Sequence, residues 1–355
     1  MRLKNELGSD SNQSSLNKSS PQHFKEFVLT QKPHPLSRRR FSQGLATAVV
    51  ALPLHSFGQA KVARIIVAFP PGGPVDFVAR TLAEQLGKEL GQQVIVENKA
   101  GGNGAIAAEF VSRATPDGTT LWLTSVGAVA INPALYEKLA YDPVRDLTPV
   151  SLVVNNVEVL VVPANAPYNT GAEMVAAARM PGAKLTMASS GTGSVPHLAM
   201  ELLNDAAKIN ILHVPYKGAA PAITDVIAGH VNGFFGDIPG LIGHIKGGKL
   251  KAIGIAAPKR HPLLPEVKTF NEMGVPGVDS DNWYALFAAK GTPASDAERV
   301  SQAVRRTLND AAVKTKLLQS GAEPAPSTSA ELAALLKSDS AKWAQVVKSK
   351  NVKPD

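Results

Sequence analysis

The sequence contains no cysteine among its 355 residues, which excludes disulfide bonds, thiolate catalysis and zinc sites built on cysteine. Aromatic residues make up only 5% of the chain, and no basic stretch is interleaved with them. The formal net charge of +8 is concentrated at the start, because residues 1–60 carry eight Lys or Arg and three Asp or Glu, which leaves about +3 for residues 61–355. A nucleic-acid-binding surface is therefore not expected.

Signatures of catalysis and of metal binding are also missing. The eight histidines form no HExxH or similar ligand spacing, no serine stands in a GxSxG motif, and no two carboxylates are placed for acid–base chemistry. Gly102, Gly104 and Ala107 match the dinucleotide-binding pattern GxGxxA. The next strand ends at Ser125 rather than at an acidic residue, so these small residues more simply allow a helix to pack closely on a sheet. We expect neither a cofactor nor a metal ion.

The first 60 residues have the composition of a disordered leader followed by an export signal. Residues 1–36 are rich in Ser, Asn, Gln and Lys and show no apolar periodicity. The next stretch, SRRRFSQGLATAVVALPLHSFGQA, combines an arginine cluster, an apolar run too short to span a bilayer, and small residues. Arg38 and Arg39 resemble a twin-arginine signal, although Sec signals also carry arginines, and the alternative is a basic tail before a buried helix. We expect cleavage near Ala60 and a periplasmic location.

The rest of the chain alternates short apolar runs with helical patterns. Strands are expected at 63–69, 93–98, 120–125, 185–190, 210–216, 231–237, 250–257 and 283–291, with two more strands joined by a turn at 151–168. Helices are expected at 76–90, 103–114, 173–180, 220–230, 295–310 and 330–350, and residues 191–207 are expected to be a Gly/Ser loop that opens a further helix. This order predicts two α/β arrays with parallel strands, and the late helices are expected to return and complete the first array.

The stretch FPPGGPVD has the layout of an anion-binding loop. Gly72 and Gly73 let backbone N–H groups approach a ligand, and Pro74 suits the first turn of the helix that follows. The free N–H groups and the dipole at the start of a helix favour a carboxylate or a phosphate. Asp76 could instead cap the helix and fill the site itself. These residues alone are equally compatible with an anion site and with an empty strand–helix turn.

Two later loops have similar chemistry. The stretch SSGTGSVPH offers hydroxyl and N–H donors at a helix start, which suits a carboxylate, whereas a nucleophilic serine would need a general base and a different motif. His197 is expected to pack or to orient this loop. In HVPYKGAAP, Lys217 could contact an anion or could be a solvated lysine, and both interpretations stay open.

Taken together, these loops resemble the tripartite tricarboxylate transporter substrate-binding proteins, also called Bug receptors. The matching stretches are FPPGGPVDFVAR, VIVENKAGGNGAIAAEFVSRATPDGTTLWL, AINPALYEKLAYDPVRDLTPVSL, HLAMELL, VPYKGAAPAITDVIAGHV and DNWYALFAAKGTP. The resemblance implies an α/β fold with the two-domain periplasmic-binding-protein architecture, a type II-like Venus flytrap with mixed sheets flanked by helices and a cleft between the domains. Residues 61–161 and 284–355 would form domain 1, and residues 162–283 would form domain 2.

The resemblance also implies a receptor rather than an enzyme. Such a receptor, expected as a monomer, would capture a small carboxylate (a di- or tricarboxylate, an acidic amino acid or an aromatic acid) in the cleft, without a cofactor. It would deliver this ligand to the membrane subunits of a tripartite tricarboxylate-type transporter or to a sensor. The alternative is a periplasmic enzyme that acts on a small carboxylate.

The ligand-binding residues that the resemblance implies are carried over by position. They are Gly72, Gly73, Pro74, Val75, Asp76, Ser125, Asn132, Ser190, Gly191, Thr192, Ser194, Lys217, Gly218 and Asp237. The sequence departs from the family pattern at Ala128 and Val129, where Thr-His is common, and at Gly236 and Asp237, where Asp-Asn is common. These changes are expected near the cleft, where they remove polar partners, allow a less polar or larger ligand and weaken an assignment to citrate.

Overall fold

The computed structural model describes residues 62–354, so the expected leader, the twin-arginine-like signal and the cleavage site near Ala60 lie outside the described residues. The strands are β1 (Ala63–Val67), β2 (Val94–Asn98), β3 (Thr120–Ser125), β4 (Leu147–Pro163), β5 (Thr186–Ser189), β6 (Leu212–Pro215), β7 (Gly233–Asp237), β8 (Leu250–Ile255), β9 (Asp281–Ala289) and β10 (Glu323–Pro324). The helices are α1 (Pro74–Leu90), α2 (Ala105–Ser112), α3 (Asn132–Leu135), α4 (Gly171–Ala178), α5 (Val195–Ala207), α6 (Ala219–Ala228), α7 (Ile238–Lys246), α8 (Ala294–Asn309), α9 (Ala311–Ser320) and α10 (Ser329–Ser349).

The strands form a mixed sheet with two parallel regions. Its order is β2-β1-β3-β9-β4-β7-β5-β6, and β8 and β10 also pair with β4. Strand β1 pairs in parallel with β2 and β3, and β5 pairs in parallel with β6 and β7. Between these regions β9 and β4 run antiparallel to their neighbours. The predicted α/β class with mixed sheets is therefore confirmed.

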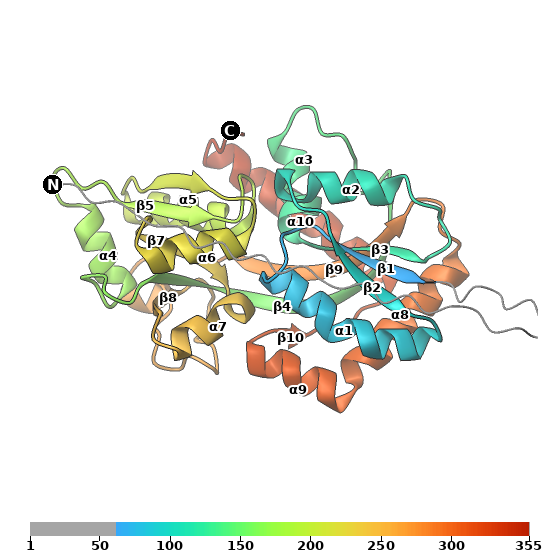
Figure 1. Ribbon diagram of the computed structural model, residues 1–355. Helices are drawn as coiled ribbons and strands as arrows, with labels where there is room; N and C mark the ends of the chain where they lie inside the picture. The colour runs from blue at the N-terminus through green and yellow to red at the C-terminus, as the bar shows by residue number, and fades with distance from the viewer. Residues whose placement is uncertain (1–61, 355) are drawn as a thin grey trace, which may run out of the picture. The chain divides into compact units, whose positions relative to one another are not determined.

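Strand β4 joins the two regions. It pairs with β9 along its first part and with β7 and β8 along its last part, and it passes from one group of helices to the other (Figure 1). We call the elements around β1–β3 and β9, with α1–α3 and α8–α10, the first lobe. The elements around β5–β8, with α4–α7, are the second lobe.

The prediction of two strands joined by a turn within residues 151–168 is wrong, because β4 is a single strand that continues to Pro163. Asn155 and Asn156 favour a turn locally, but here they pair with Trp283 and Asn282 of β9. Backbone pairing with β9 outweighs the local preference of the two asparagines for a turn, and the two register shifts of β4 lie before them, between Pro149 and Ser151 and between Leu152 and Val154. Helices α7 and α9 and the short strand β10 were not expected from the sequence.

Helix α1 shows how local sequence places the first glycine-rich loop. Pro74 occupies its first turn, and its buried positions recur every three or four residues, with Val78, Leu82 and Leu86 fully enclosed. Gly91 ends the helix in the left-handed conformation, with φ of 66°. The apolar stripe fixes α1 on the sheet, so the start of the helix stays at the end of β1.

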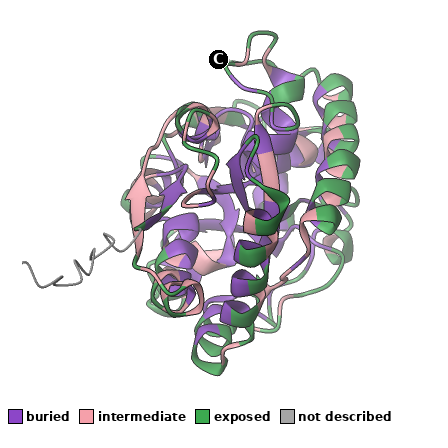
Figure 2. Ribbon diagram, turned by 90° about the vertical axis from the view of Figure 1, so that its right-hand side faces the viewer, coloured by how far each residue is buried: buried purple, intermediate pink, exposed green. Residues whose placement is uncertain are grey.

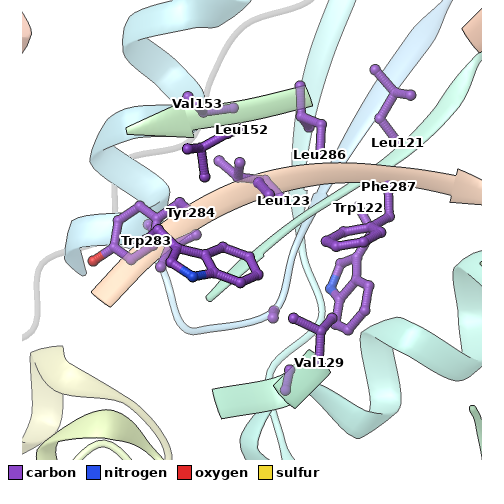
Figure 3. Close-up of a cluster of buried hydrophobic side chains, with 14 of the residues drawn as sticks. Leu121, Trp122, Leu123, Val129, Leu152, Val153, Trp283, Tyr284, Leu286 and Phe287 are labelled. Atoms are coloured by element: carbon purple, nitrogen blue, oxygen red, sulfur yellow. The ribbon is translucent and has the colours of Figure 1, made fainter. Parts of the chain in front are cut away.

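Each lobe has its own apolar core. The cluster of the first lobe includes the side chains that Figure 3 shows around Trp122 and Phe287, which contact each other with ring centroids 6.0 Å apart. Two further clusters belong to the second lobe. Along β4 the membership changes between Val154 and Val159. Buried strands lie inside helices whose outer faces are exposed (Figure 2). The domain limits expected from the sequence stay a prediction.

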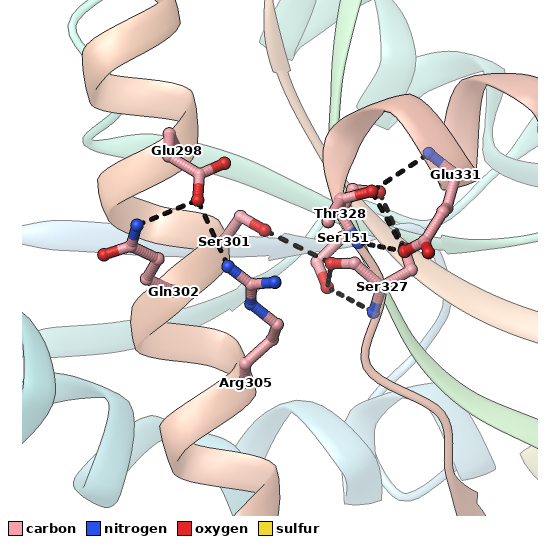
Figure 4. Close-up of polar contacts among 8 residues, drawn as sticks. All are labelled: Ser151, Glu298, Ser301, Gln302, Arg305, Ser327, Thr328 and Glu331. Carbon is pink, nitrogen blue, oxygen red and sulfur yellow. Dashed lines mark hydrogen bonds and ion pairs between the residues drawn. The ribbon is translucent and has the colours of Figure 1, made fainter.

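The C-terminal segment packs in the first lobe. Ser327 joins it to β4 and α8: its carbonyl accepts hydrogen bonds from Ser151 Oγ (2.9 Å) and Ser301 Oγ (3.2 Å), as Figure 4 shows. Thr328 and Glu331 then form a capping box at the start of α10.

No helix of residues 62–354 is long and apolar enough to cross a membrane.

Candidate functional site

An enclosed cavity lies where the two lobes meet. Its lining consists of Phe69, Gly73, Pro74, Val75 and Ser125 from the first lobe, Ser190, Ser194, Val195, Pro196, Ala219, Phe234, Gly236 and Asp237 from the second, and Asn282 and Tyr284 from β9. The cavity measures about 20 Å³, which is room for about one water molecule. A neighbouring cavity of about 210 Å³ shares Phe69 and Ser190 with it. We call the two cavities together the cleft.

Larger hollows occur elsewhere on the molecule. One of about 760 Å³ lies beside α1 and β2, and one of about 1000 Å³ is lined by β4, β9 and the segment after β8. Neither is lined by the two glycine-rich loops. The cleft is the better candidate site because helix N-termini from both lobes meet there.

The first glycine-rich loop presents the start of α1 to the cleft. Gly73 is the N-cap residue, and no side chain caps the helix. The N–H groups of the first turn are therefore left for a ligand, at the positive end of the helix dipole. Gly73, Pro74 and Val75, which the sequence predicted, all line the enclosed cavity.

Asp76 supports this loop and does not line the cleft. Its Oδ2 accepts hydrogen bonds from Gly72 N (3.0 Å) and Arg80 Nε (2.9 Å), and its Oδ1 accepts one from Asn98 Nδ2 (2.9 Å). Burial disfavours its ionised form, but hydrogen bonds from Arg80, Gly72 and Asn98 outweigh that effect and lower the pKa of Asp76. Asp76 and Gly72 are thus positioning residues, and Asp76 is not the N-cap that the sequence allowed.

The second glycine-rich loop presents the start of α5. Ser194 is its N-cap, and its Oγ accepts a hydrogen bond from His197 N at 3.4 Å. His197 Nδ1 accepts a hydrogen bond from Gly193 N at 3.2 Å, and its ring stacks on His213 with centroids 3.8 Å apart. His213 in turn lies 2.6 Å from Ser189 Oγ. His197 therefore orients the loop, as the sequence indicated.

Most of the remaining predicted residues line one of the two cavities of the cleft. The enclosed cavity is lined by Ser125, Ser190, Ser194 and Asp237, and the neighbouring cavity of about 210 Å³ is lined by Ser190, Gly191, Thr192 and Lys217. Gly218 lines neither, but it touches the opposite lobe: with φ of 123°, a Cβ placed on it would lie 2.5 Å from Pro70 Cδ.

Asn132 is enclosed in the first lobe rather than at the cleft. Its amide accepts a hydrogen bond from Asn103 Nδ2 (3.0 Å) and donates to Asn103 O (3.2 Å) and Tyr141 Oη (3.1 Å). It holds the Gly101–Gly104 loop, which lines the larger cavity. Ala128 and Val129 are fully buried and line neither cavity, because both belong to the core of the first lobe, where Figure 3 shows Val129. Of the four residues at which the sequence departs from the family pattern, Gly236 and Asp237 line the cleft.

Sequence reasoning missed most of the floor of the enclosed cavity. Asn282 Nδ2 donates to both carboxylate oxygens of Asp237 at 3.0 Å and to Glu158 Oε1 at 3.5 Å. The Tyr284 hydroxyl donates to Asp237 Oδ2. Glu158 is fully buried and lies directly opposite Asp237 in the β4–β7 pairing. We call Glu158, Asp237, Asn282 and Tyr284 the floor cluster.

Burial favours the protonated forms of both acids of the floor cluster. Burial and the neighbouring Asp237 charge raise the pKa of Glu158 well above its usual value. Burial also raises the pKa of Asp237, although hydrogen bonds from Tyr284, Asn282 and Glu158 limit the rise to about 6. The hydrogen bond between the two acids raises the pKa of Glu158 and lowers that of Asp237, so a proton on the pair favours Glu158.

Some signals for the floor cluster were present in the sequence. Glu158 is the only acid in the apolar run VVNNVEVLVV, and a lone acid in such a strand indicates a buried charge. Asn282 and Tyr284 stand in the stretch DNWYALF. Nothing local, however, indicates that these residues meet Asp237.

The electrostatics of the cleft are unusual for an anion site. The enclosed cavity is lined by no Lys, Arg or His, and Lys217 lines only the larger one. Within residues 62–354 no cluster of three His, Asp or Glu side chains could hold a metal ion. A carboxylate would be bound by backbone N–H groups and hydroxyls at the two helix starts.

Comparison with known proteins agrees with this geometry. Residues 78–352 match the model of the tripartite tricarboxylate transporter family receptor. A UPF0065 protein encoded in the tcbD–tcbE intergenic region of Pseudomonas sp. strain P51 is 36% identical over 318 residues, which cover 88% of this chain and 94% of that protein.

Solved structures are similar over the same region. The periplasmic binding protein BugD shares 32% identity with a TM-score of 0.79, over 83% of this chain and 99% of BugD. MatC from Rhodopseudomonas palustris with bound malate shares 34% identity with a TM-score of 0.77, over 81% of this chain and 98% of MatC. Another R. palustris protein, with adipate, shares 30% identity with a TM-score of 0.80, over 82% of this chain and 98% of that protein. The predicted two-domain periplasmic-binding-protein fold is confirmed.

Proposed function

The chain belongs to the tripartite tricarboxylate transporter receptor family, and on this premise we propose that it captures a small carboxylate in the cleft and delivers it to a membrane transporter or a sensor. This family consists of periplasmic substrate-binding receptors, not of enzymes. One observation carries the proposal: the uncapped start of α1 and the start of α5 come from opposite lobes and line the same enclosed cavity.

The proposed ligand contacts follow from this arrangement. The N–H groups of Gly73 and Val75 and the hydroxyls of Ser125, Ser190 and Ser194 would bind the carboxylate, with Pro74 lining the cavity beside them. Gly191, Thr192 and Lys217 would contact the part of the ligand that extends into the larger cavity. Gly72, Asp76, Asn132 and Gly218 would act indirectly, through the loops that they hold. The malate and the adipate in the related structures support a carboxylate as the ligand class.

The lobes would have to separate for a ligand to enter. They touch where Gly218 meets Pro70, and a Cβ on Gly240 would lie 3.1 Å from Pro74 Cδ. The enclosed cavity of about 20 Å³ has room for about one water molecule, so a carboxylate placed between the two helix starts needs more space than this conformation provides there. We propose that residues 61–161 with 284–355 move against residues 162–283, and that the ligand favours closure because it contacts both.

Export is part of the proposal. The stretch SRRRFSQGLATAVVALPLHSFGQA would direct the protein to the periplasm by the Tat or the Sec route, with cleavage near Ala60. Sequencing the N-terminus of the protein isolated from the periplasm tests the cleavage site. A first residue far from Lys61 would contradict it.

A binding assay tests the receptor function. Isothermal titration calorimetry with malate, adipate and a panel of other small carboxylates should give saturable one-to-one binding. Mass spectrometry of the recovered ligand should show no chemical change. A ligand that emerges altered would favour the alternative, a periplasmic enzyme that acts on a small carboxylate.

A further inference from the structure

The floor cluster brings two buried acids to the cleft. Glu158 and Asp237 are direct cross-strand neighbours, where two ionised acids would destabilise the sheet. The hydrogen bond between them raises the pKa of Glu158 and lowers that of Asp237, so the negative charge favours Asp237. Asp237 lines the enclosed cavity and is therefore the acid that a ligand can reach.

The hydrogen bonds of the floor cluster leave one acceptor without a donor. Asn282 lines the enclosed cavity, is 4% exposed, and uses its Nδ2 for the two acids. Its Oδ1 is enclosed and has no hydrogen-bond partner within the described residues. A donor from a ligand would satisfy this oxygen, whereas a further acceptor would not.

The negative charge of the floor cluster also lacks a cation. No positive charge acts on Glu158 or Asp237, and no Lys, Arg or His within residues 62–354 forms an ion pair with either. Asp237 is the N-cap residue of α7 but makes no side-chain hydrogen bond to that helix. A buried charge without a partner is costly unless something neutralises it.

We infer that the floor cluster is a subsite for a protonated nitrogen, so that the ligand is an amino-carboxylate, with its carboxylate at the starts of α1 and α5 and its ammonium group against Asp237 and Asn282. This inference rests on the proposed function and narrows its ligand class. A plain dicarboxylate would place its second carboxylate against Asp237, where like charges repel. An ammonium group would supply the missing donor and the missing positive charge.

Matched ligands of equal length test the subsite. Isothermal titration of the mature protein at pH 7.5 compares 4-aminobutanoate with succinate, 5-aminopentanoate with glutarate, and 6-aminohexanoate with adipate. In each pair the two molecules differ in one terminal group, ammonium or carboxylate. The amino-carboxylate should bind at least about tenfold more tightly in the pair whose length fits.

Asp237→Asn tests the contribution of the negative charge of Asp237 to ligand preference. It removes the negative charge and keeps the shape, so the preference for the amino-carboxylate should fall at least about tenfold. The readout is a ratio of two affinities, which a general loss of stability does not change. Asp205→Asn, which removes an acid that pairs with Lys208 and Lys350 on the surface, is the matched control and should keep the ratio.

The outcomes distinguish this inference from the function on which it rests. Tighter binding of the dicarboxylate in every pair, or an unchanged ratio in Asp237→Asn, would overturn the ammonium subsite and leave carboxylate capture intact. No binding of any carboxylate, in this panel or the wider one, would contradict the proposed function itself.

Discussion

At the scale of the residue, a substitution of Gly73 should change ligand affinity without disturbing the fold. Its φ is −82°, and a Cβ placed on it would meet only Pro70 O, at 3.6 Å. Gly73→Val is therefore compatible with the loop, but its methyl groups would occupy the space where N–H groups approach a ligand. Calorimetry should show at least about a tenfold loss of affinity for the best carboxylate. Gly243→Val is the control, because Gly243 has open space around it, and unchanged affinity in Gly73→Val would remove the first loop from the site.

Asp76 should contribute stability that depends on pH. Its pKa is lowered in the folded protein, so its contribution is present above the ordinary value of 3.8 and is lost as the pH falls through the folded value. Asp76→Ala leaves Gly72 N without its acceptor, which should cost about 1–3 kcal/mol at pH 7. Denaturant unfolding of both proteins from pH 7 to pH 3 should show this difference shrinking at the acid end.

A surface acid provides the comparison for Asp76. Glu84 pairs only with Lys88, and both are exposed, so Glu84→Ala should change the unfolding midpoint little. An Asp76→Ala protein as stable as wild type across this range would contradict the role of Asp76 in holding the loop.

Glu158 should have the opposite pH dependence. Its pKa is raised above 4.5 in the folded protein, so its contribution is full below pH 4.5 and is lost as the pH rises toward the folded value. Glu158→Gln cannot ionise and lacks this loss. The unfolding free energy of wild type should therefore fall relative to Glu158→Gln from pH 5 to pH 8, by up to about 1.4 kcal/mol per pH unit. Parallel pH profiles would show that Glu158 is not buried in a protonated state.

Single residues of the candidate site could be predicted where the site is built from consecutive residues, and not where it is built by strand pairing. Gly73 and Ser194 could be predicted as candidate ligand contacts because a glycine-rich or hydroxyl-rich loop before a helix is recognisable from a few consecutive residues. Glu158, Asp237 and Asn282 come together only through the pairing of β4 with β7 and β9. No short stretch of sequence shows that pairing, so only Asp237, through its position in a family stretch, was predicted.

At the scale of the element, the N-terminus of α6 should control closure. Gly218 has φ of 123° and faces Pro70 of the other lobe. Gly218→Ala strains the backbone and forces a Cβ against that proline, so the closed state should be disfavoured. Small-angle scattering with saturating ligand should give a larger radius of gyration than wild type, and affinity should fall at least about fivefold.

Gly229 provides the matched control for Gly218. It flanks the same helix, has φ of 77°, and a Cβ placed on it would have no other atom within 4 Å. Gly229→Ala should therefore lose stability, by about 1 kcal/mol, and still close on its ligand. Equal affinity in both variants would contradict a role for the contact between Gly218 and Pro70 in closure.

The elements themselves were predicted well where a repeating apolar pattern marked them. Helix α1, with its stripe of buried residues and Gly91 at its end, and strands β1 to β3 follow directly from such patterns. The single strand β4 does not, because two asparagines favour a turn and only β9 keeps them extended. Helix α7 begins directly after β7, and glycines at 240 and 243 weaken its pattern.

At the scale of the whole molecule, helix starts from both lobes and the acids of the floor cluster meet at one cleft. The starts of α1 and α5 line the enclosed cavity, and so do Asp237, Asn282 and Tyr284. On our proposal, a ligand with one carboxylate and one ammonium group would bind to both and bridge the lobes. The sequence predicted the class of fold and the two glycine-rich loops, but not most of the floor cluster, which is built by residues from three separate strands.

The most direct test of carboxylate capture in the cleft is a crystal structure of the mature protein with the tightest carboxylate from the titration panel. We expect the ligand between the lobes, unaltered, with its carboxylate within hydrogen-bond distance of the N–H groups of Gly73 or Val75 and of Ser190 or Ser194. Density for the ligand outside the cleft, or in the cleft with its carboxylate away from both helix starts, would contradict carboxylate capture by the two glycine-rich loops.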